Sequence, residues 1–483
     1  MLFNSIDFAI FMPVVFLLYW FVFRRNLRAQ NLLVVVASYV FYGWWDWRFL
    51  GLLLFSSLLD YGVGLGLARQ TDIRNRKILL SLSILANLGL LGFFKYFNFF
   101  VDNFTAAFSL LGHPIKANTL NIILPVGISF YTFQTLSYTI DVYKGRMEPT
   151  RDLVAFLAFV SFFPQLVAGP IERAANLLPQ FQRPRKFDYA AAVDGLRQIL
   201  WGLFKKMVIA DNCAAHVNAI FADTEAFPGS MRFLGVLFFA FQIYGDFSGY
   251  SDVAIGTARL LGFDLMRNFA YPYFSRDIAE FWRRWHISLS TWFRDYLYVP
   301  LGGSRGGTGM KIRNTFIIFI VSGFWHGANW TFIVWGLLNA LYFLPLLLSG
   351  QNRQHLEIVA RGRILPSIRD FFRMLLTFVL TLLAWVFFRA RTVSDAIAYL
   401  SGIFSSSLWD FPKFKDVAPG LVTLLLVLFM QTIEWHGREH PFALARLGLK
   451  WKRPFRWMFY AFILFLIGMY MKTKDIPFIY FQF

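Results

Sequence analysis

The sequence is poor in charged residues. Only 16% of its 483 residues are Asp, Glu, Lys or Arg, whereas a water-soluble domain carries about 25%. Hydrophobic residues make up 57% of the chain and aromatic residues 20%. So large an apolar share with so few charges excludes an ordinary soluble protein and indicates a membrane protein.

Cysteine is almost absent, because Cys213 is the one cysteine of the chain. A disulfide within the chain and a cysteine-rich metal site are therefore excluded. Cys213 lies in an apolar stretch, which favours a small buried core residue over a nucleophile.

The sequence also lacks long Gly/Ser-rich or Pro-rich linkers and a repeat of fixed period. We therefore expect one integral domain over residues 1–483. Residues 392–417 mix apolar and polar positions between two apolar runs. This pattern predicts an amphipathic segment that lies on the outer membrane surface.

Apolar stretches recur along the whole chain. Several reach the roughly 20 residues that cross a bilayer, and others are short enough to be re-entrant. We expect an all-α, polytopic integral membrane protein with about 10 to 13 membrane-embedded helices, some of them broken. The stretches are 7–23, 31–43, 79–101, 121–139, 152–168, 190–215, 233–262, 314–349, 371–388, 418–433 and 456–472.

The net charge of +19 comes from 47 basic against 28 acidic residues, and the basic residues gather in short connectors. This is the positive-inside pattern, so the charge indicates cytoplasmic connectors against anionic lipids and not a nucleic-acid partner. Segments 1–7, 102–120 and 217–231, which carry almost no Lys or Arg, are expected outside. The basic connectors are 24–28, 69–77, 144–151, 173–186, 305–313, 353–369 and 438–456.

Charges within apolar surroundings are costly and therefore mark candidate functional residues. On a helical wheel over residues 281–296, Arg283, His286, Ser290 and Arg294 form a polar stripe beside an aromatic face. Such a helix would line a polar cavity within the protein. The alternative is an amphipathic helix at the membrane surface.

A second polar site is Ser322-Gly323-Phe324-Trp325-His326-Gly327-Ala328-Asn329-Trp330, between two apolar runs. Its glycines and asparagine predict a break in the helix, where freed backbone groups must face protein or water. His326 is expected at this break, deep in the membrane. A lone buried histidine is more often structural, so the pattern by itself leaves catalysis open.

A third polar group contains Asp246 and Asp252. We expect these carboxylates to be structural and to balance Arg283 and Arg284. No carboxylate–histidine grouping has the spacing of metal ligands, so no metal site is predicted.

With these residues identified, the chain resembles the membrane-bound O-acyltransferase family, and within it the branch of bacterial alginate O-acetyltransferases. The motifs are long and span about residues 1–390. They are Leu124-Pro125-Val126-Gly127-Ile128-Ser129-Phe130-Tyr131, Ala168-Gly169-Pro170-Ile171, Asp246 to Asp252, Phe281 to Tyr298, and Trp325-His326-Gly327-Ala328-Asn329-Trp330.

The resemblance implies many helices around a central funnel and a catalytic role for two histidines. His326 matches the invariant histidine of the family, and His286 matches a second position that is important for activity. We expect His326 to act as general base, with His286 holding the acceptor or the developing oxyanion. The residues expected to bind substrate beside them are Asn329, Ser290, Trp325, Arg283 and Arg294.

The resemblance further implies a multi-pass protein of the bacterial inner membrane that acetylates an exported polysaccharide, most closely alginate. Acetyl-CoA is the expected donor, no tightly bound cofactor is expected, and a periplasmic or membrane-anchored partner of the SGNH-hydrolase kind would receive the acetyl group. Cellulose and peptidoglycan acetylation and D-alanylation of teichoic acid are alternatives. A transporter or flippase is the alternative from another class, since transporters also use broken helices.

Overall fold

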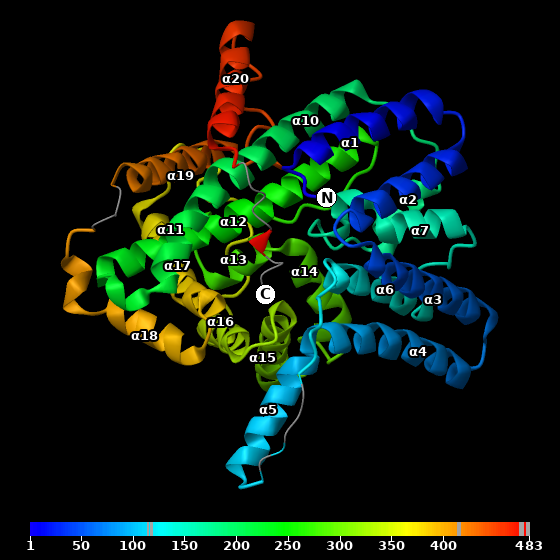
Figure 1. Cartoon of the computed structure of the whole chain (residues 1–483), viewed down its shortest axis with the longest axis horizontal. Coiled ribbons are helices and arrows are strands. Elements are labelled where there is room, and N and C mark those ends of the chain that lie inside the picture. The colour runs from blue at the N-terminus through cyan, green and yellow to red at the C-terminus, as the bar shows by residue number, and fades with distance from the viewer. Residues whose placement is uncertain (114, 116–118, 413–416, 473–477, 480–483) are drawn as a thin grey trace. The chain divides into compact units, whose positions relative to one another are not determined.

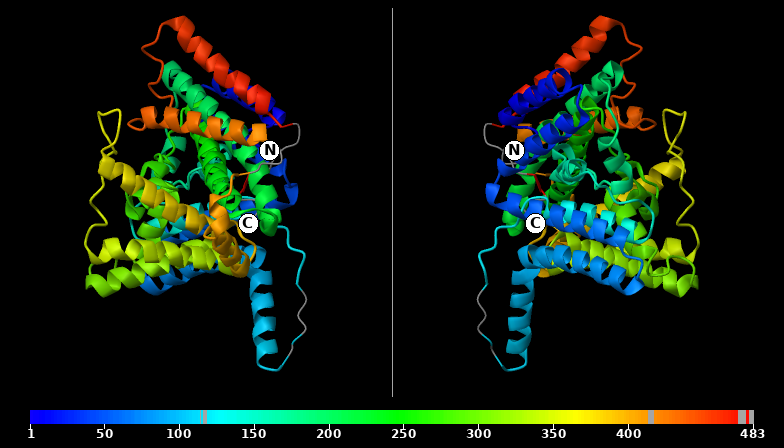
Figure 2. Two further views of the ribbon diagram at one scale, coloured as in Figure 1. Left: turned by 90° about the vertical axis from the view of Figure 1, so that its left-hand side faces the viewer. Right: turned by 90° about the vertical axis from the view of Figure 1, so that its right-hand side faces the viewer.

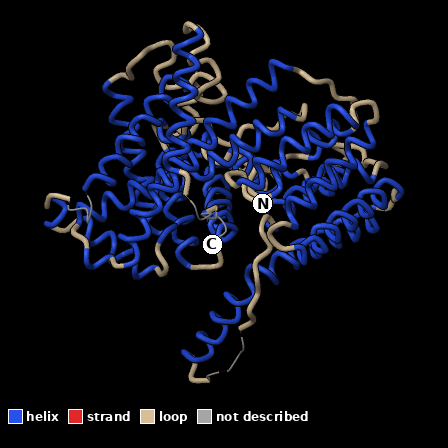
Figure 3. The backbone as a smooth tube through the Cα atoms, turned by 45° about the horizontal axis from the view of Figure 1, so that its top comes forward, coloured by secondary structure: helices blue, strands red, loops and turns tan. Residues whose placement is uncertain are grey.

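The chain folds into helices joined by loops (Figure 3) in a computed structural model, which describes residues 1–113, 115, 119–412, 417–472 and 478–479. No strand occurs among these residues, and the predicted all-α class is confirmed. Parts of the expected outer segments 102–120 and 392–417 lie outside the described residues.

Within the part of the chain that the structure describes, five helical stretches are long and apolar enough to cross a membrane, so the chain is a multi-pass membrane protein. They are Trp47–Arg69, Ile73–Leu110, Trp330–Leu348, Ile368–Arg389 and Pro419–Gly437. Shorter apolar helices cover Ile6–Val22, Leu153–Leu166 and Val393–Ile403. The expected total of about 10 to 13 embedded helices, which also counts re-entrant and broken ones, stays a prediction.

The chain divides into two compact units, so the expectation of one integral domain stays a prediction. The first unit comprises Met1–Tyr189 and Ala258–Leu265, and the second comprises Ala190–Thr257 and Met266–Phe483. Both candidate histidines belong to the second unit.

In the first unit, α3, α4 and α6 pack side by side, and α2 packs on α7 (Figure 1). Asp60 of α3 is buried there and accepts hydrogen bonds from Ser83 Oγ at 2.6 Å and Asn87 Nδ2 at 2.8 Å. Figure 2 shows α5 turning away from α4 at the π-helical turn η3. The helices are α1 Ile6–Leu17, η1 Leu18–Val22, α2 Leu27–Gly43, η2 Trp47–Phe49, α3 Leu50–Arg69, α4 Ile73–Leu91, η3 Gly92–Tyr96, α5 Phe97–Leu110, α6 Ile128–Tyr143, α7 Leu153–Ser161, α8 Phe163–Leu166 and α9 Ala174–Phe181.

The second unit contains the long helix α12, apart from its last turn, and the antiparallel pair α15 and α16. Its helices are α10 Tyr189–Leu203, η4 Phe204–Ala210, α11 Asp211–Ala222, η5 Thr224–Ala226, α12 Gly229–Leu260, η6 Pro272–Phe274, α13 Ile278–Arg284, α14 Ile287–Phe293, η7 Arg294–Tyr298, α15 Gly307–His326, α16 Trp330–Leu348, α17 Ile368–Arg389, α18 Val393–Ile403, η8 Ser406–Trp409, α19 Val417–Gly437 and α20 Arg453–Tyr470.

Glycines let α15 and α16 approach closely. A side chain at Gly323 of α15 would collide with the carbonyl oxygen of Phe332, and one at Gly336 of α16 would collide with that of Phe319. The two backbones therefore touch near the tip of the hairpin, and this contact fixes the position of His326.

The segment predicted to be amphipathic contains α18. Ala396, Tyr399 and Ile403 are buried on one side of this helix, whereas Ile397 on the helix and Phe404 just after it are exposed. The buried face anchors the segment to the rest of the second unit. Its place at the outer surface stays a prediction.

Candidate active site

His326 is the last residue of α15, and α16 begins four residues later at Trp330. Asn329 caps α16, because its side-chain oxygen accepts a hydrogen bond from the backbone N–H of Thr331 at 3.0 Å. The predicted break at His326 is therefore confirmed. His326 is only 3% exposed.

Aromatic rings surround the imidazole of His326. Its centroid lies 4.9 Å from the Trp325 ring, 5.2 Å from the Trp335 ring and 5.3 Å from the Phe388 ring. Trp335 in turn stacks on Trp385 at 5.8 Å. These rings come from α15, α16 and α17, so three helices fix the orientation of one side chain. Inside such a low-dielectric shell a proton acceptor interacts strongly with a bound substrate.

The expectation of a single helix over residues 281–296 is wrong. The chain forms α13 up to Arg284 and α14 from Ile287, and His286 between them has a positive φ of 44°. The main chain of a neighbouring segment causes the break, since Ala270 N–H donates to Arg284 O and Ile287 N–H donates to Asn268 O, both at 2.9 Å. The polar stripe read from a helical wheel does not exist as such.

His286 is buried and hydrogen-bonded to Asn268. Its Nδ1 lies 3.0 Å from the Asn268 side-chain oxygen, and Ser288 donates to the same oxygen through its hydroxyl at 2.9 Å and its backbone N–H at 3.3 Å. The imidazole also packs edge-on against Phe247 at 4.6 Å.

The Trp325 ring contacts both imidazoles. Its centroid lies 6.2 Å from that of His286 and 4.9 Å from that of His326. The structure therefore brings together the three residues Trp325, His286 and His326, which the sequence placed in two separate motifs.

Other predicted site residues have defined partners. Ser290 donates to Trp285 O at 3.3 Å, and Asn329 Nδ2 donates to Arg391 O at 2.9 Å. Arg294 pairs with the adjacent Asp295 and is 61% exposed. Ser290 thus lies at the helix break, Asn329 beside the tip of the hairpin and Arg294 on the surface.

The arginines of α13 hold the connector that follows α16. Arg283 donates to the carbonyl oxygens of Asn352 and His355, each at 2.8 Å. Arg284 pairs with Glu280 at 2.6 Å and donates to Glu357 O at 3.2 Å. These bonds place α13 and His286 next to the basic connector 353–369.

The expected pairing of Asp246 and Asp252 with Arg283 and Arg284 is wrong. Asp246 pairs with Lys206 Nζ at 2.8 Å, and Asp252 pairs with Lys205 Nζ at 2.7 Å. Both lysines lie on the π-helical segment η4, whose extra residue per turn brings two consecutive side chains toward α12. The structural role expected for the carboxylates stays a prediction, but their partners are these lysines.

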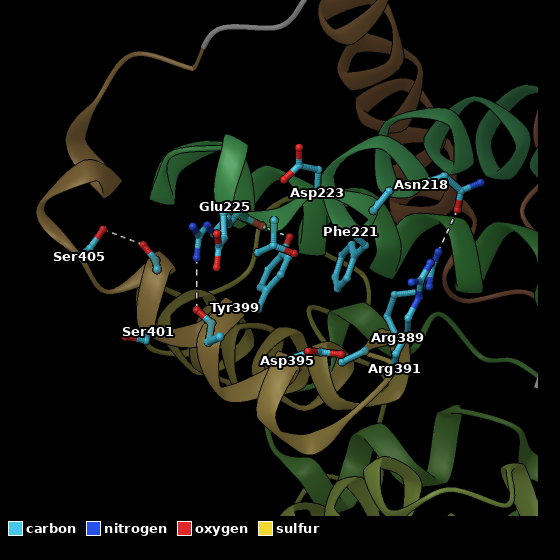
Figure 4. Close-up of a pocket in the computed structure, with 16 residues that line it drawn as sticks. Asn218, Phe221, Asp223, Glu225, Arg389, Arg391, Asp395, Tyr399, Ser401 and Ser405 are labelled. Carbon is cyan, nitrogen blue, oxygen red and sulfur yellow. Dashed lines mark hydrogen bonds between the residues drawn. The ribbon is translucent and has the colours of Figure 1, made fainter.

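A polar cleft of about 930 Å³ lies at the C-terminal end of α17, between α11, α18 and the start of α12 (Figure 4). Three arginines and three carboxylates line it, namely Arg232, Arg389, Arg391, Asp223, Glu225 and Asp395. Arg389 donates to Asn218 at 3.0 Å. Because Phe388 contacts His326 and Asn329 bonds to Arg391 O, the cleft adjoins the tip of the α15–α16 hairpin.

Sequence reasoning missed Asn268, Lys205 and Lys206. The two lysines were visible as charges within the apolar stretch 190–215. Asn268 gave no such signal, because it sits in a loop 18 residues before His286 and no local pattern links the two positions. Among the described residues, no group of three His, Cys, Asp or Glu side chains could hold a metal ion.

The chain matches the model of the membrane-bound O-acyltransferase family over residues 150–388. It is also 40% identical to "Probable alginate O-acetylase AlgI" of Azotobacter vinelandii, over 88% of this chain and 83% of that protein. The chain belongs to the membrane-bound O-acyltransferase family. As a member of this family it is an O-acyltransferase, and the matched range contains both histidines.

Two further relatives cover most of this O-acyltransferase. "Probable alginate O-acetylase AlgI" of Pseudomonas putida is 37% identical over the full length of both chains. A "Peptidoglycan O-acetyltransferase" of Helicobacter pylori is 37% identical over 83% of this chain and 80% of that protein. The similarity thus extends well beyond the range matched by the family model.

Proposed function

We propose that this protein transfers acetyl groups across the bacterial inner membrane for O-acetylation of an exported polysaccharide, alginate. The observation that carries this proposal is the pair of histidines, His286 and His326, whose imidazoles both lie against the ring of Trp325 in an O-acyltransferase. Two relatives, of whose length this chain covers at least four fifths, are named as alginate O-acetylases, and this supports alginate as the polymer.

The two histidines have different neighbourhoods, and these support approach from opposite membrane faces. His286 follows α13, whose arginines hold the basic connector that the positive-inside rule assigns to the cytoplasm. His326 lies at the hairpin tip beside the polar cleft, which includes part of the Lys- and Arg-poor segment 217–231. A cytoplasmic thioester and an external acceptor would meet between them.

His326 acts as the general base in the proposed reaction. It takes the proton of an acceptor hydroxyl while the hydroxyl oxygen forms a bond to the carbonyl carbon of the acetyl thioester. The carbon–sulfur bond then breaks, and the departing thiolate of CoA receives the proton from the imidazolium. No redox partner or metal is needed for this balance of atoms and charges.

The remaining predicted residues assist by position. His286 holds the acceptor by accepting a hydrogen bond from its hydroxyl, or donates one to the tetrahedral oxyanion, and the Trp325 ring lies against both imidazoles. Asn329 and Ser290 shape the site at the hairpin tip and the helix break, and Arg283 acts through the connector it binds. Arg294 would meet donor phosphates at the surface.

The acceptor is proposed to reach the site through the polar cleft, either as polymer or as a periplasmic SGNH-type partner that carries the acetyl group onward. Peptidoglycan is the second candidate polymer, because the Helicobacter pylori relative is 37% identical over most of both chains. These cases are separated by measuring acetyl transfer from the purified protein to each polymer in turn, with and without the partner.

The proposal is tested with His326→Ala in purified protein that receives radiolabelled acetyl-CoA. Acetyl transfer should fall to background while insertion and melting temperature stay unchanged. His436→Ala, which alters an exposed histidine, is the matched control and should keep full activity. If His326→Ala retains acetyl transfer, His326 is not the general base. If the wild type takes up solute but transfers no acetyl group, the protein is a transporter.

A further inference from the structure

Asn268 lies where three parts of the second unit meet. It is fully buried, it follows α12 in the chain, and it contacts the break between α13 and α14 through both its backbone and its side chain. Its side-chain nitrogen donates to Ser251 Oγ of α12 at 3.2 Å. Both ends of the amide are therefore engaged.

The orientation of this amide follows from its partners. The backbone N–H of Ser288 is a hydrogen-bond donor and cannot accept, and it lies 3.3 Å from Asn268 Oδ1. A reversed amide would bring its NH2 group against this donor. The atom near Ser288 and His286 is therefore the oxygen, and the NH2 group points to Ser251.

The orientation of the amide determines the tautomer of His286. A carbonyl oxygen only accepts, so the His286 nitrogen 3.0 Å away must carry its proton on Nδ1. In a neutral imidazole the second nitrogen, Nε2, then has the lone pair. The pattern is that of catalytic histidines held by a hydrogen-bonding partner at Nδ1.

We propose that Asn268 is a positioning residue of this O-acyltransferase, whose side-chain oxygen fixes the His286 proton on Nδ1 and presents Nε2 to the reacting groups. The backbone of Asn268 serves the same end, because its carbonyl accepts from Ile287 and holds the left-handed turn at His286. The inference about catalysis rests on the proposed function, whereas the inference about the tautomer does not.

The tautomer is measured by ¹⁵N NMR on protein with ¹⁵N-labelled histidine in detergent micelles. The chain has seven histidines, and the loss of one signal set in His286→Gln assigns the resonances of His286. The wild type should show a protonated Nδ1 and an unprotonated Nε2. A wild-type spectrum with the proton on Nε2 overturns the proposal without any variant.

Three variants separate positioning from structural support. Asn268→Leu removes the acceptor at similar size and should populate the other tautomer. Asn268→Asp keeps an acceptor oxygen and should keep the proton on Nδ1. Ser288→Ala removes one neighbouring hydroxyl but leaves the Asn268–His286 bond, and it should leave the His286 spectrum unchanged.

Activity provides a second measurement. Asn268→Leu should lower kcat on the order of 100-fold with little change in KM, and Asn268→Asp should recover a large part of the loss. An unaltered tautomer in Asn268→Leu overturns the proposal. A shifted tautomer with unchanged kcat keeps the assignment of the proton but removes His286 from the proposed mechanism, so the two failures are distinguishable.

Discussion

At the scale of single residues, the two histidines differ in how their backbones are held. His326 ends a helix next to Gly327, whereas His286 sits in a left-handed turn without glycine or proline on either side. The first break was predictable because glycines interrupt the apolar run. The second was not, since main-chain bonds from residues 268 and 270 impose it, and one sequence does not show which loop will pair with which turn.

Replacing the second histidine tests its share in the reaction. His286→Ala should lower the rate of acetyl transfer by about 10²-fold or more, the usual range for loss of a positioned acid–base or hydrogen-bonding group. Initial rates with acetyl-CoA at saturation measure this change. A rate equal to that of the wild type assigns His286 a purely structural role.

At the scale of elements, the α15–α16 hairpin depends on close backbone contact. Gly323→Ala should destabilise the protein by about 1–3 kcal/mol, because the added methyl group meets the carbonyl oxygen of Phe332. Gly309→Ala on the same helix meets nothing within 4 Å, and alanine favours helix. Thermal unfolding in detergent should show a lower midpoint for the first variant and no loss for the second.

The π-helical segment η4 carries a buried ion-pair cluster. Lys206 Nζ lies 2.9 Å from Asp211 and 2.8 Å from Asp246. Lys206→Met should destabilise the fold by about 3–5 kcal/mol, since it leaves two buried carboxylates without this cation. Lys450→Met, at an exposed position, is the control for thermal unfolding. Equal melting temperatures for both variants contradict a structural role of the cluster.

Sequence patterns predicted the positions of helices better than they predicted which charged side chains form ion pairs. Apolar runs located the helices around residues 314–349 and 371–388 because burial in lipid requires them. The charge pairs were assigned wrongly, because Asp246 and Asp252 were matched to arginines when lysines 40 or more positions earlier in the chain lie closer. Pairing depends on how α12 and η4 pack, and no local pattern records that packing.

At the scale of the whole molecule, the proposed function requires a fixed orientation in the membrane. Ser401 lines the polar cleft and is exposed, whereas Arg361 is exposed on the basic connector. The single native cysteine, Cys213, is buried, so an introduced thiol can be labelled selectively.

In intact cells, a membrane-impermeant maleimide should label Ser401→Cys and should leave Arg361→Cys unlabelled until the membrane is opened. The cleft then faces outward and the connector inward, as the positive-inside rule predicts. The reverse labelling pattern means that acceptor and donor approach from the sides opposite to those proposed.

The left-handed turn at His286 has one more consequence. An L-residue with a side chain pays roughly 1–2 kcal/mol for this backbone region, and glycine would occupy it without that penalty. A protein selected for durability alone would carry glycine here. Replacing His286 with glycine would remove the penalty, but it would also remove the imidazole that the proposed reaction uses. Stabilising substitutions should therefore be sought at other positions of the fold.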